Sequence, residues 1–120
     1  CANLRIQFSD ATIVCRNLEK EALPKSFDCQ FDIVVMTYFL WRPLFKDIAR
    51  VLRPGGSLLL ETFHLKNHEL RGKPRRTQLA LASDEASALA SAAGLAVQVT
   101  DEGERGQVYS SRLWATKGLP

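Results

Sequence analysis

The sequence contains little cysteine, and its few cysteines do not form a metal-binding pattern. Cys1, Cys15 and Cys29 are odd in number and lack the C-x-x-C spacing that zinc and redox sites use. A free cysteine behaves as a small hydrophobic residue and is usually buried. We therefore expect reduced, buried thiols in a cytoplasmic protein, and no metal site.

Long apolar runs are also absent. No run in the 120 residues approaches the roughly 20 residues that a membrane-spanning helix needs, and the first residues carry no signal-peptide pattern. Hydrophobic residues make up 46% of the chain and charged residues 24%, which is ordinary for a globular domain. These values predict a single domain over residues 1–120, with no membrane segment.

Two further absences concern glycine motifs and the initiator methionine. The seven glycines do not form the G-x-G-x-x-G fingerprint of dinucleotide-binding proteins, which disfavours a nucleotide-dependent dehydrogenase. The chain begins at Cys1 rather than at methionine. We expect either that residues are missing upstream or that the chain is a processed piece of a longer protein.

What the sequence does contain is a strand–helix–strand pattern over residues 31–63. Residues 31–36 and 58–60 are almost continuously apolar, as in strands that are buried on both faces. Between them, Pro43 suits the first turn of a helix, and residues 44–52 carry an apolar stripe at helical spacing. Two such strands joined by a helix predict a βαβ unit and therefore a parallel sheet.

Weaker patterns flank this unit. Residues 11–15 are β-branched and apolar, and they predict another strand. Ser83 is a good capping residue for an alanine-rich helix that ends near residue 93. Residues 95–100 and 107–116 alternate like half-buried strands, and their short connection predicts an antiparallel hairpin. The predicted fold class is α/β, with a mostly parallel sheet that ends in this hairpin.

A basic segment lies within residues 64–77, which show no clean periodicity and are interpreted as a surface loop. Its charged residues are Lys66, Glu69, Arg71, Lys73, Arg75 and Arg76. An excess of cations can bind an anionic substrate or a nucleic-acid backbone, but it is also typical of a solvated loop. An anion or nucleic-acid binder is therefore an alternative, although nucleic acid is the less favoured ligand.

Two motifs carry a resemblance to a known family. They are FDIVVMTYFLWRPL, starting at Phe31, and LRPGGSLLLETF, which ends at Phe63. Together with the C-terminal hairpin they resemble the C-terminal two-thirds of a class I S-adenosylmethionine-dependent methyltransferase with a Rossmann-like sheet. With Asn67, the run from Gly72 to Arg75 and Leu79, the chain is similar to a bacterial subfamily that methylates small molecules and is related to tellurite-resistance proteins.

The resemblance implies a cofactor site and a substrate site, and it assigns no catalytic residue. Asn17 and Leu18 would flank the adenine of S-adenosylmethionine, and Thr37 and Tyr38 would lie near its methyl group. The residues that would face the substrate are Tyr38, Arg42, Thr62 and His64. Structural alternatives stay open, because Tyr38 could simply pack between sheet and helix and Arg42 could bind backbone carbonyls at a turn.

The chain departs from the family pattern at its N-terminal side. It has neither the D-x-G-x-G loop nor the acid that binds the ribose hydroxyls, and Asn17 stands where relatives usually carry an acid. The family's first two strands would pair beside the strand from Phe31 to Met36, whose apolar edge would otherwise be bare. We expect residues 11–15, a second copy in a homodimer or a missing N-terminal segment to cover that edge.

Two functions follow from this resemblance. With an upstream half, the protein would be an S-adenosylmethionine-dependent methyltransferase that acts on a small molecule. If the 120 residues are the whole protein, we expect a catalytically inactive remnant that works as a dimer or a binding module.

Overall fold

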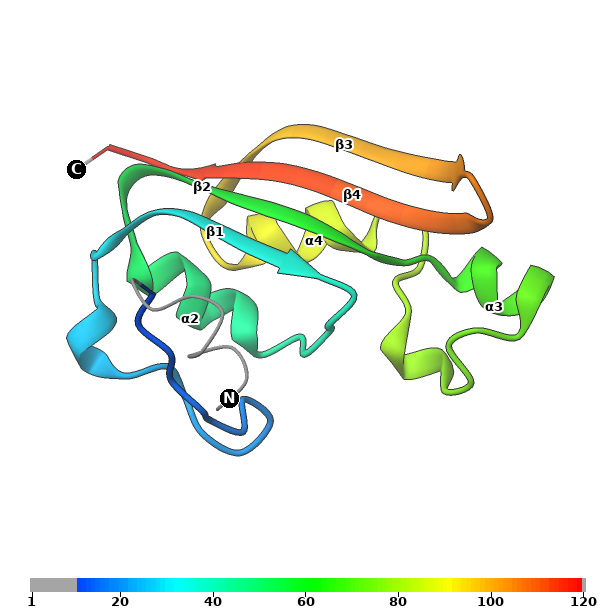
Figure 1. The fold of residues 1–120 in the computed structure, drawn as a ribbon. Helices are drawn as coiled ribbons and strands as arrows, with labels where there is room; N and C mark the ends of the chain where they lie inside the picture. The colour runs from blue at the N-terminus through cyan, green and yellow to red at the C-terminus, as the bar shows by residue number, and fades with distance from the viewer. Residues whose placement is uncertain (1–10, 120) are drawn as a thin grey trace.

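The computed structural model describes residues 11–119 and contains one mixed sheet with helices on one side (Figure 1). In chain order the elements are η1 (Lys25–Phe27), β1 (Phe31–Thr37), α2 (Leu44–Val51), β2 (Leu52–Phe63), α3 (Leu65–Arg71), η2 (Thr77–Leu79), α4 (Glu85–Ala92), β3 (Leu95–Arg105) and β4 (Val108–Lys117). No helix within this part of the chain is long and apolar enough to cross a membrane.

The sheet has the strand order β1-β2-β4-β3. Strands β1 and β2 are parallel, whereas β4 runs antiparallel to both of its neighbours. The predicted α/β class and the C-terminal hairpin are confirmed. The expectation of a mostly parallel sheet is wrong for the described residues, because residues 11–15 form no strand and β4 pairs antiparallel with both β2 and β3.

The predicted βαβ unit is confirmed as β1-α2-β2. Helix α2 starts directly after Pro43, whose φ of −61° is already helical. Its apolar stripe, which includes Leu44, Ile48 and Val51, is buried against the sheet. Burying such a stripe removes apolar surface from water and is the main force that fixes a short helix to a sheet.

The Pro-Gly-Gly segment lies within the bounds of β2, at a break in its pairing with β1. Phe31 pairs with Leu52 but Ile33 pairs with Ser57, so extra residues of β2 bulge out between them. A Cβ at Gly56 would lie 3.0 Å from the carbonyl oxygen of Asp32. Glycine is therefore required where β2 bends back toward β1.

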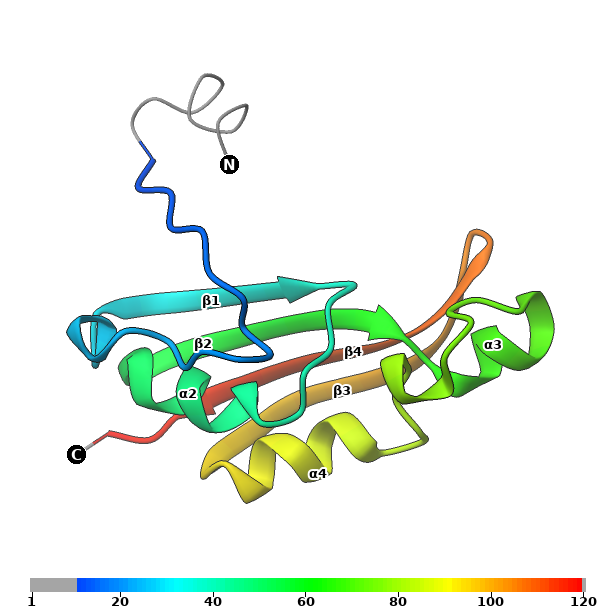
Figure 2. The ribbon, with the colours of Figure 1, turned by 90° about the horizontal axis from the view of Figure 1, so that it is seen from below.

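Helices α2 and α4 cover the same face of the sheet (Figure 2). The core lies between them and that face, and its largest buried side chains include Phe45, Ile48, Leu52, Leu58 and Leu81. No helix in residues 11–119 covers the opposite face (Figure 1). The expectation that residues 31–36 and 58–60 are buried on both faces is therefore wrong.

An apolar row crosses the uncovered face. Val35 pairs with Leu59, Leu59 pairs with Trp114 and Trp114 pairs with Val99, so these four side chains lie side by side on four strands. Each is between 41% and 63% exposed. We call these four residues the apolar row.

Residues 64–77, which were predicted to form a surface loop, contain a helix. Residues 65–71 form α3, which ends at Gly72 with a left-handed φ of 69°. The expected serine cap of α4 is also wrong. Ser83 lies by the Nε2 atom of His64, and the carboxylate of Glu85 accepts the hydrogen bond from the backbone N–H of Ala82.

The cysteines differ from expectation as well. Cys29 is a free thiol but is exposed, and Cys15 is exposed and disulfide-bonded. The expectation of buried, reduced thiols is therefore wrong for both described cysteines, and Cys1 lies outside the described residues.

Candidate functional site

The carboxyl end of β1 places Thr37 and Tyr38 at the rim of the sheet. Tyr38 adopts a left-handed φ of 51°, and its backbone N–H donates to the carbonyl oxygen of Glu61 over 2.8 Å. Its ring contacts that of Phe63, with centroids 4.9 Å apart. A non-glycine residue at positive φ is uncommon, and this turn directs the chain away from the sheet at the point where α/β proteins bind ligands.

A cavity of about 390 Å³ lies between this end of β1, helix α2 and the turn after Asn17. It brings together Leu18 and Thr37, two of the predicted cofactor residues. Its other walls are apolar and come from Leu23, Val34, Val35, Met36, Phe39, Leu44 and Ile48. An apolar cavity of this size suits a flat heterocycle.

Asn17 and Tyr38 do not line this cavity. The Oδ1 atom of Asn17 accepts a hydrogen bond from the backbone N–H of Glu19 over 3.1 Å. The carbonyl oxygen of Asn17 accepts from Lys20 and Glu21 at 3.0 and 2.8 Å. Asn17 therefore holds the turn that positions Leu18.

Arg42, a predicted substrate residue, is fixed by the protein. Its guanidinium donates to the carbonyl oxygens of Gln78 and Ala80 over 2.7 and 3.1 Å and forms a two-point ion pair with Glu85. The hydrogen bond from Arg42 holds the pKa of Glu85 below its ordinary value, and Glu85 raises that of Arg42. Arg42 thus joins the loop before α2 to η2 and α4, as its structural alternative anticipated.

Thr62 and His64 are both buried, on the helix side of the sheet. The Nδ1 atom of His64 accepts from the backbone N–H of Lys66 over 2.9 Å, so its ring proton lies on Nε2. That atom lies 3.2 Å from both Ser83 Oγ and Glu102 Oε2. The four predicted substrate residues therefore do not converge on one cavity, and His64 instead caps α3 against the hairpin.

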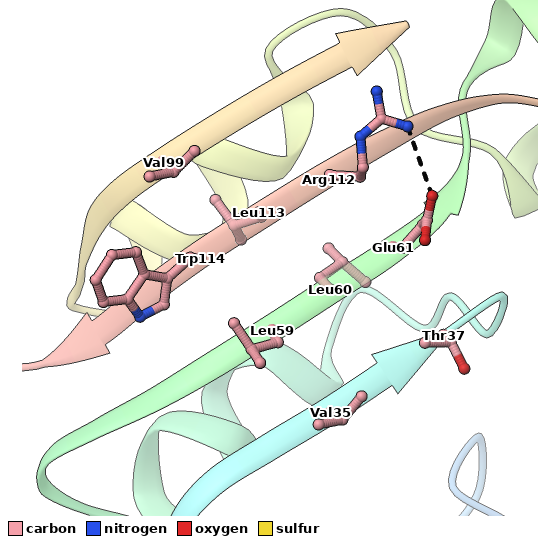
Figure 3. Close-up of a pocket in the computed structure, with 9 residues that line it drawn as sticks. All are labelled: Val35, Thr37, Leu59, Leu60, Glu61, Val99, Arg112, Leu113 and Trp114. Atoms are coloured by element: carbon pink, nitrogen blue, oxygen red, sulfur yellow. Dashed lines mark ion pairs between the residues drawn. The ribbon is translucent and has the colours of Figure 1, made fainter. Parts of the chain in front are cut away.

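The uncovered face carries a second hollow, of about 350 Å³, over the apolar row (Figure 3). Beside that row, the side chain of Arg112 lies between Glu61 and Asp101, with a 2.7 Å ion pair to Asp101. Arg112 lowers the pKa of the Asp101 carboxylate. The ion pairs occupy the charged groups of this hollow, and most of its other lining side chains are apolar.

Two more cavities continue from the one beside β1. A cavity of about 260 Å³ shares Leu18 and Leu44 with it, and a third, of about 310 Å³, shares Glu19, Trp41 and Pro43 with the second. Among the lining residues, Glu19 has no role predicted from the sequence, and Trp41 and Leu79 enter only through the family resemblance. The only signal for Arg76, which also lines the third cavity, was its place in the basic segment.

The basic segment is partly neutralised by the fold. Arg71 forms an ion pair with Glu104, and the ammonium group of Lys66 lies 5.6 Å from the ring centre of Tyr109. Within residues 11–119 no ion pair is formed by Lys73, Arg75 or Arg76. The same part of the chain holds no group of acids, histidines and cysteines that could bind a metal ion.

Comparison with known proteins identifies the family. A family model described as a methyltransferase domain matches residues 1–60, which is half of the chain. The chain belongs to this methyltransferase domain family. The predicted membership of the S-adenosylmethionine-dependent methyltransferase superfamily is confirmed, whereas no curated protein matches the sequence.

Solved structures share the fold of this methyltransferase domain. A SAM-dependent methyltransferase from Methanosarcina mazei is 21% identical, with a TM-score of 0.59, over 78% of this chain and 62% of its own. A second one, from Aquifex aeolicus, is 19% identical, with a TM-score of 0.67, over 96% of this chain and 59% of its own. The [4+2]-cyclase SpnF is 13% identical, with a TM-score of 0.74, over 99% of this chain and 61% of its own. The chain spans about 60% of the length of these proteins.

The residues around the cavity beside β1 fit one part of S-adenosylmethionine better than the others. The cavity beside β1 offers apolar walls for an adenine ring, with the hydroxyl-bearing Thr37 among them. None of its lining residues is acidic, and no D-x-G-x-G loop occurs in the sequence. The described residues therefore fit the adenine end of the cofactor, but not its ribose or its amino-acid end.

Proposed function

We propose that this domain belongs to an enzyme that transfers a methyl group from S-adenosylmethionine to a small molecule. The observation that supports this most directly is the apolar cavity of about 390 Å³ at the carboxyl end of β1, which Leu18 and Thr37 line together. Ligands of open α/β sheets bind beyond the carboxyl ends of parallel strands. The family membership of the chain supports the same cofactor.

In this proposal Leu18 and Phe39 contact the faces of the adenine, and Thr37 lies at the rim nearest to the reacting groups. When bound, the cofactor supplies a methyl group on a sulfonium, which a nucleophile can displace in line. The domain contributes mainly by holding the two reactants in that geometry, since positioning alone can lower a barrier by several kcal/mol. No general base is needed among Tyr38, Thr62 and His64.

The amino-acid end of the cofactor requires groups that the described residues do not provide. We propose that a second copy of the chain or an N-terminal segment completes the site and pairs with the edge of β1 that no strand of residues 11–119 occupies. This edge carries exposed apolar side chains, among them Ile33 at 58% and Val35 at 63%. Unpaired edges of this kind favour pairing with another chain.

The test is calorimetric titration of the chain with S-adenosylhomocysteine. We expect binding by the wild-type chain and about tenfold weaker binding by Leu18→Arg, because the longer charged side chain would occupy the apolar cavity. Leu70→Arg is the matched control, since Leu70 is 57% exposed on α3 and lines none of these cavities. Equal binding by both variants would contradict this site.

A second candidate function is a binding module without catalytic activity that works as a homodimer. The apolar row favours it, because four exposed apolar side chains in one line are unusual on a monomer. A folded dimer that does not bind S-adenosylhomocysteine would support this candidate and contradict the first.

A further inference from the structure

The third cavity, of about 310 Å³, has features that distinguish it from the cofactor cavity. It is enclosed by three segments that are distant in sequence: the turn at Glu19, the loop of Trp41 and Pro43 before α2, and the residues around η2. Trp41 and Leu79 give it an apolar wall, and Leu79 is 43% exposed. The size and lining suit one substituted aromatic ring.

Two charges of opposite sign remain available in this cavity. Arg42 also lines it, but Glu85 neutralises its charge and backbone carbonyls take its other donors. Neither Arg76 nor Glu19 forms an ion pair with any residue of the described range. Arg76 offers a forked donor for a carboxylate, and Glu19 offers an acceptor for a hydroxyl or amine.

The position of Glu19 gives this arrangement a direction. Glu19 lines the intermediate cavity as well, which in turn shares Leu18 and Leu44 with the proposed cofactor cavity. Arg76 lines only the third cavity. A ligand held by both residues would therefore have its anionic group far from the cofactor cavity and its hydroxyl or amine nearer to Leu18, on the adenine side of that cavity.

We propose that this cavity is a binding site for an aromatic acid bearing a hydroxyl or amino group. This inference stands apart from the proposed methyl transfer, because the cavities meet at Leu18 and Leu44 and not at Thr37, where the reacting groups would lie. The ring packs against Trp41 and Leu79, the carboxylate binds Arg76, and the hydroxyl or amine donates to Glu19.

The test uses Trp41 as its reporter. The chain has two tryptophans, so the variant Trp114→Phe leaves Trp41 as the single indole. Titration with 4-hydroxybenzoate should change its fluorescence, and the neutral 4-hydroxybenzamide should bind about tenfold more weakly. Equal affinity for the acid and the amide, or no binding of either, would overturn the proposal.

Matched variants in the same background separate a built site from general attraction to basic residues. Arg76→Gln should weaken binding of 4-hydroxybenzoate about tenfold. Arg75→Gln should leave it unchanged, since Arg75 is exposed and lines none of the cavities. If both variants weaken binding equally, the segment attracts anions without forming a site and the proposal fails.

The role of Glu19 is tested by comparing the affinities of 4-hydroxybenzoate and benzoate. Glu19→Ala should abolish the preference for 4-hydroxybenzoate over benzoate, whereas Glu21→Ala, which changes an acid outside this cavity, should retain it. A preserved preference in Glu19→Ala would overturn the assignment of the donor group.

Titration with S-adenosylhomocysteine separates the two proposals. Arg76→Gln should bind it as the wild type does, because Arg76 does not line the cofactor cavity. If neither the wild type nor Arg76→Gln binds S-adenosylhomocysteine but both tests of acid selectivity hold, the proposed methyl transfer is contradicted. The acid site would then still stand. Cofactor binding without selective binding of the acid would contradict only the acid site.

Discussion

At the scale of single residues, Arg42 illustrates how a side chain expected in a substrate site can have a structural role. Its bonds to Glu85, Gln78 and Ala80 join segments that lie more than 35 positions apart. We expect Arg42→Gln to lower the free energy of unfolding by about 1.5 kcal/mol, since charge-assisted bonds are lost and carbonyl groups lose their donors. Urea denaturation at neutral pH measures this.

The control for Arg42→Gln is Arg53→Gln. Arg53 pairs with Asp32, but both side chains are more than half exposed, and exposed pairs contribute about 0–1 kcal/mol. Similar losses in the two variants would show that the position of Arg42 has no special importance.

The Arg42–Glu85 pair also predicts a pH dependence. Because its folded-state pKa lies below the ordinary value of 4.5, Glu85 contributes stability that is complete above that pH and is lost as the pH falls through the folded-state value. The stability difference between wild type and Arg42→Gln should therefore shrink in acid below about pH 4.5. Denaturation at a series of pH values checks this, and a constant difference would contradict it.

The family resemblance predicted Leu18 and Thr37 as cofactor residues, and both line the cavity at the carboxyl end of β1. The sequence could not identify the third cavity. Glu19, Trp41 and Arg76 are far apart in the chain, and they meet only because Arg42 brings η2 to the loop before α2. Such long-range contacts leave no periodic signal in the sequence.

At the scale of elements, helix α3 depends on one buried amide. Asn67 is 1% exposed; its Nδ2 donates to the carbonyl of Lys73 over 2.7 Å, and its Oδ1 accepts from the N–H of Tyr109 over 2.9 Å. Asn67→Ala should lower the free energy of unfolding by about 2 kcal/mol, because two partly buried backbone groups would lose their side-chain partners. Thermal or urea denaturation measures this loss.

Glu69→Ala is the control on the same helix. Glu69 is exposed, so its replacement should change stability by less than about 0.5 kcal/mol. If Asn67→Ala were equally harmless, α3 would not depend on this amide for its attachment to β4.

The elements differ in how well the sequence predicted them. Helix α2 and the hairpin have apolar periodicities that report one buried face, so their positions could be read directly. Helix α3 has seven residues and one fully buried polar side chain in place of an apolar stripe, so no helical period exists to detect. Its helix follows from tertiary hydrogen bonds, which local sequence does not encode.

At the scale of the whole molecule, continuous apolar strands led to the expectation that these strands are buried on both faces. The pattern of residues 31–36 is suited to that arrangement, but α2 and α4 both pack on one face (Figure 2). The apolar row is the consequence. The sequence therefore indicated a need for cover that the described residues do not satisfy.

We predict that the chain associates through the uncovered face and the free edge of β1. Val35 belongs to both features and is 63% exposed, so Val35→Lys should shift the mass in solution toward the monomer, because a charge would be buried on association. Leu70→Lys is the control, since Leu70 is also exposed and apolar but lies on α3. Sedimentation velocity over a range of concentrations measures the mass. A wild-type chain that stays monomeric and folded throughout would contradict the need for cover, and an equal effect of both variants would place the interface elsewhere.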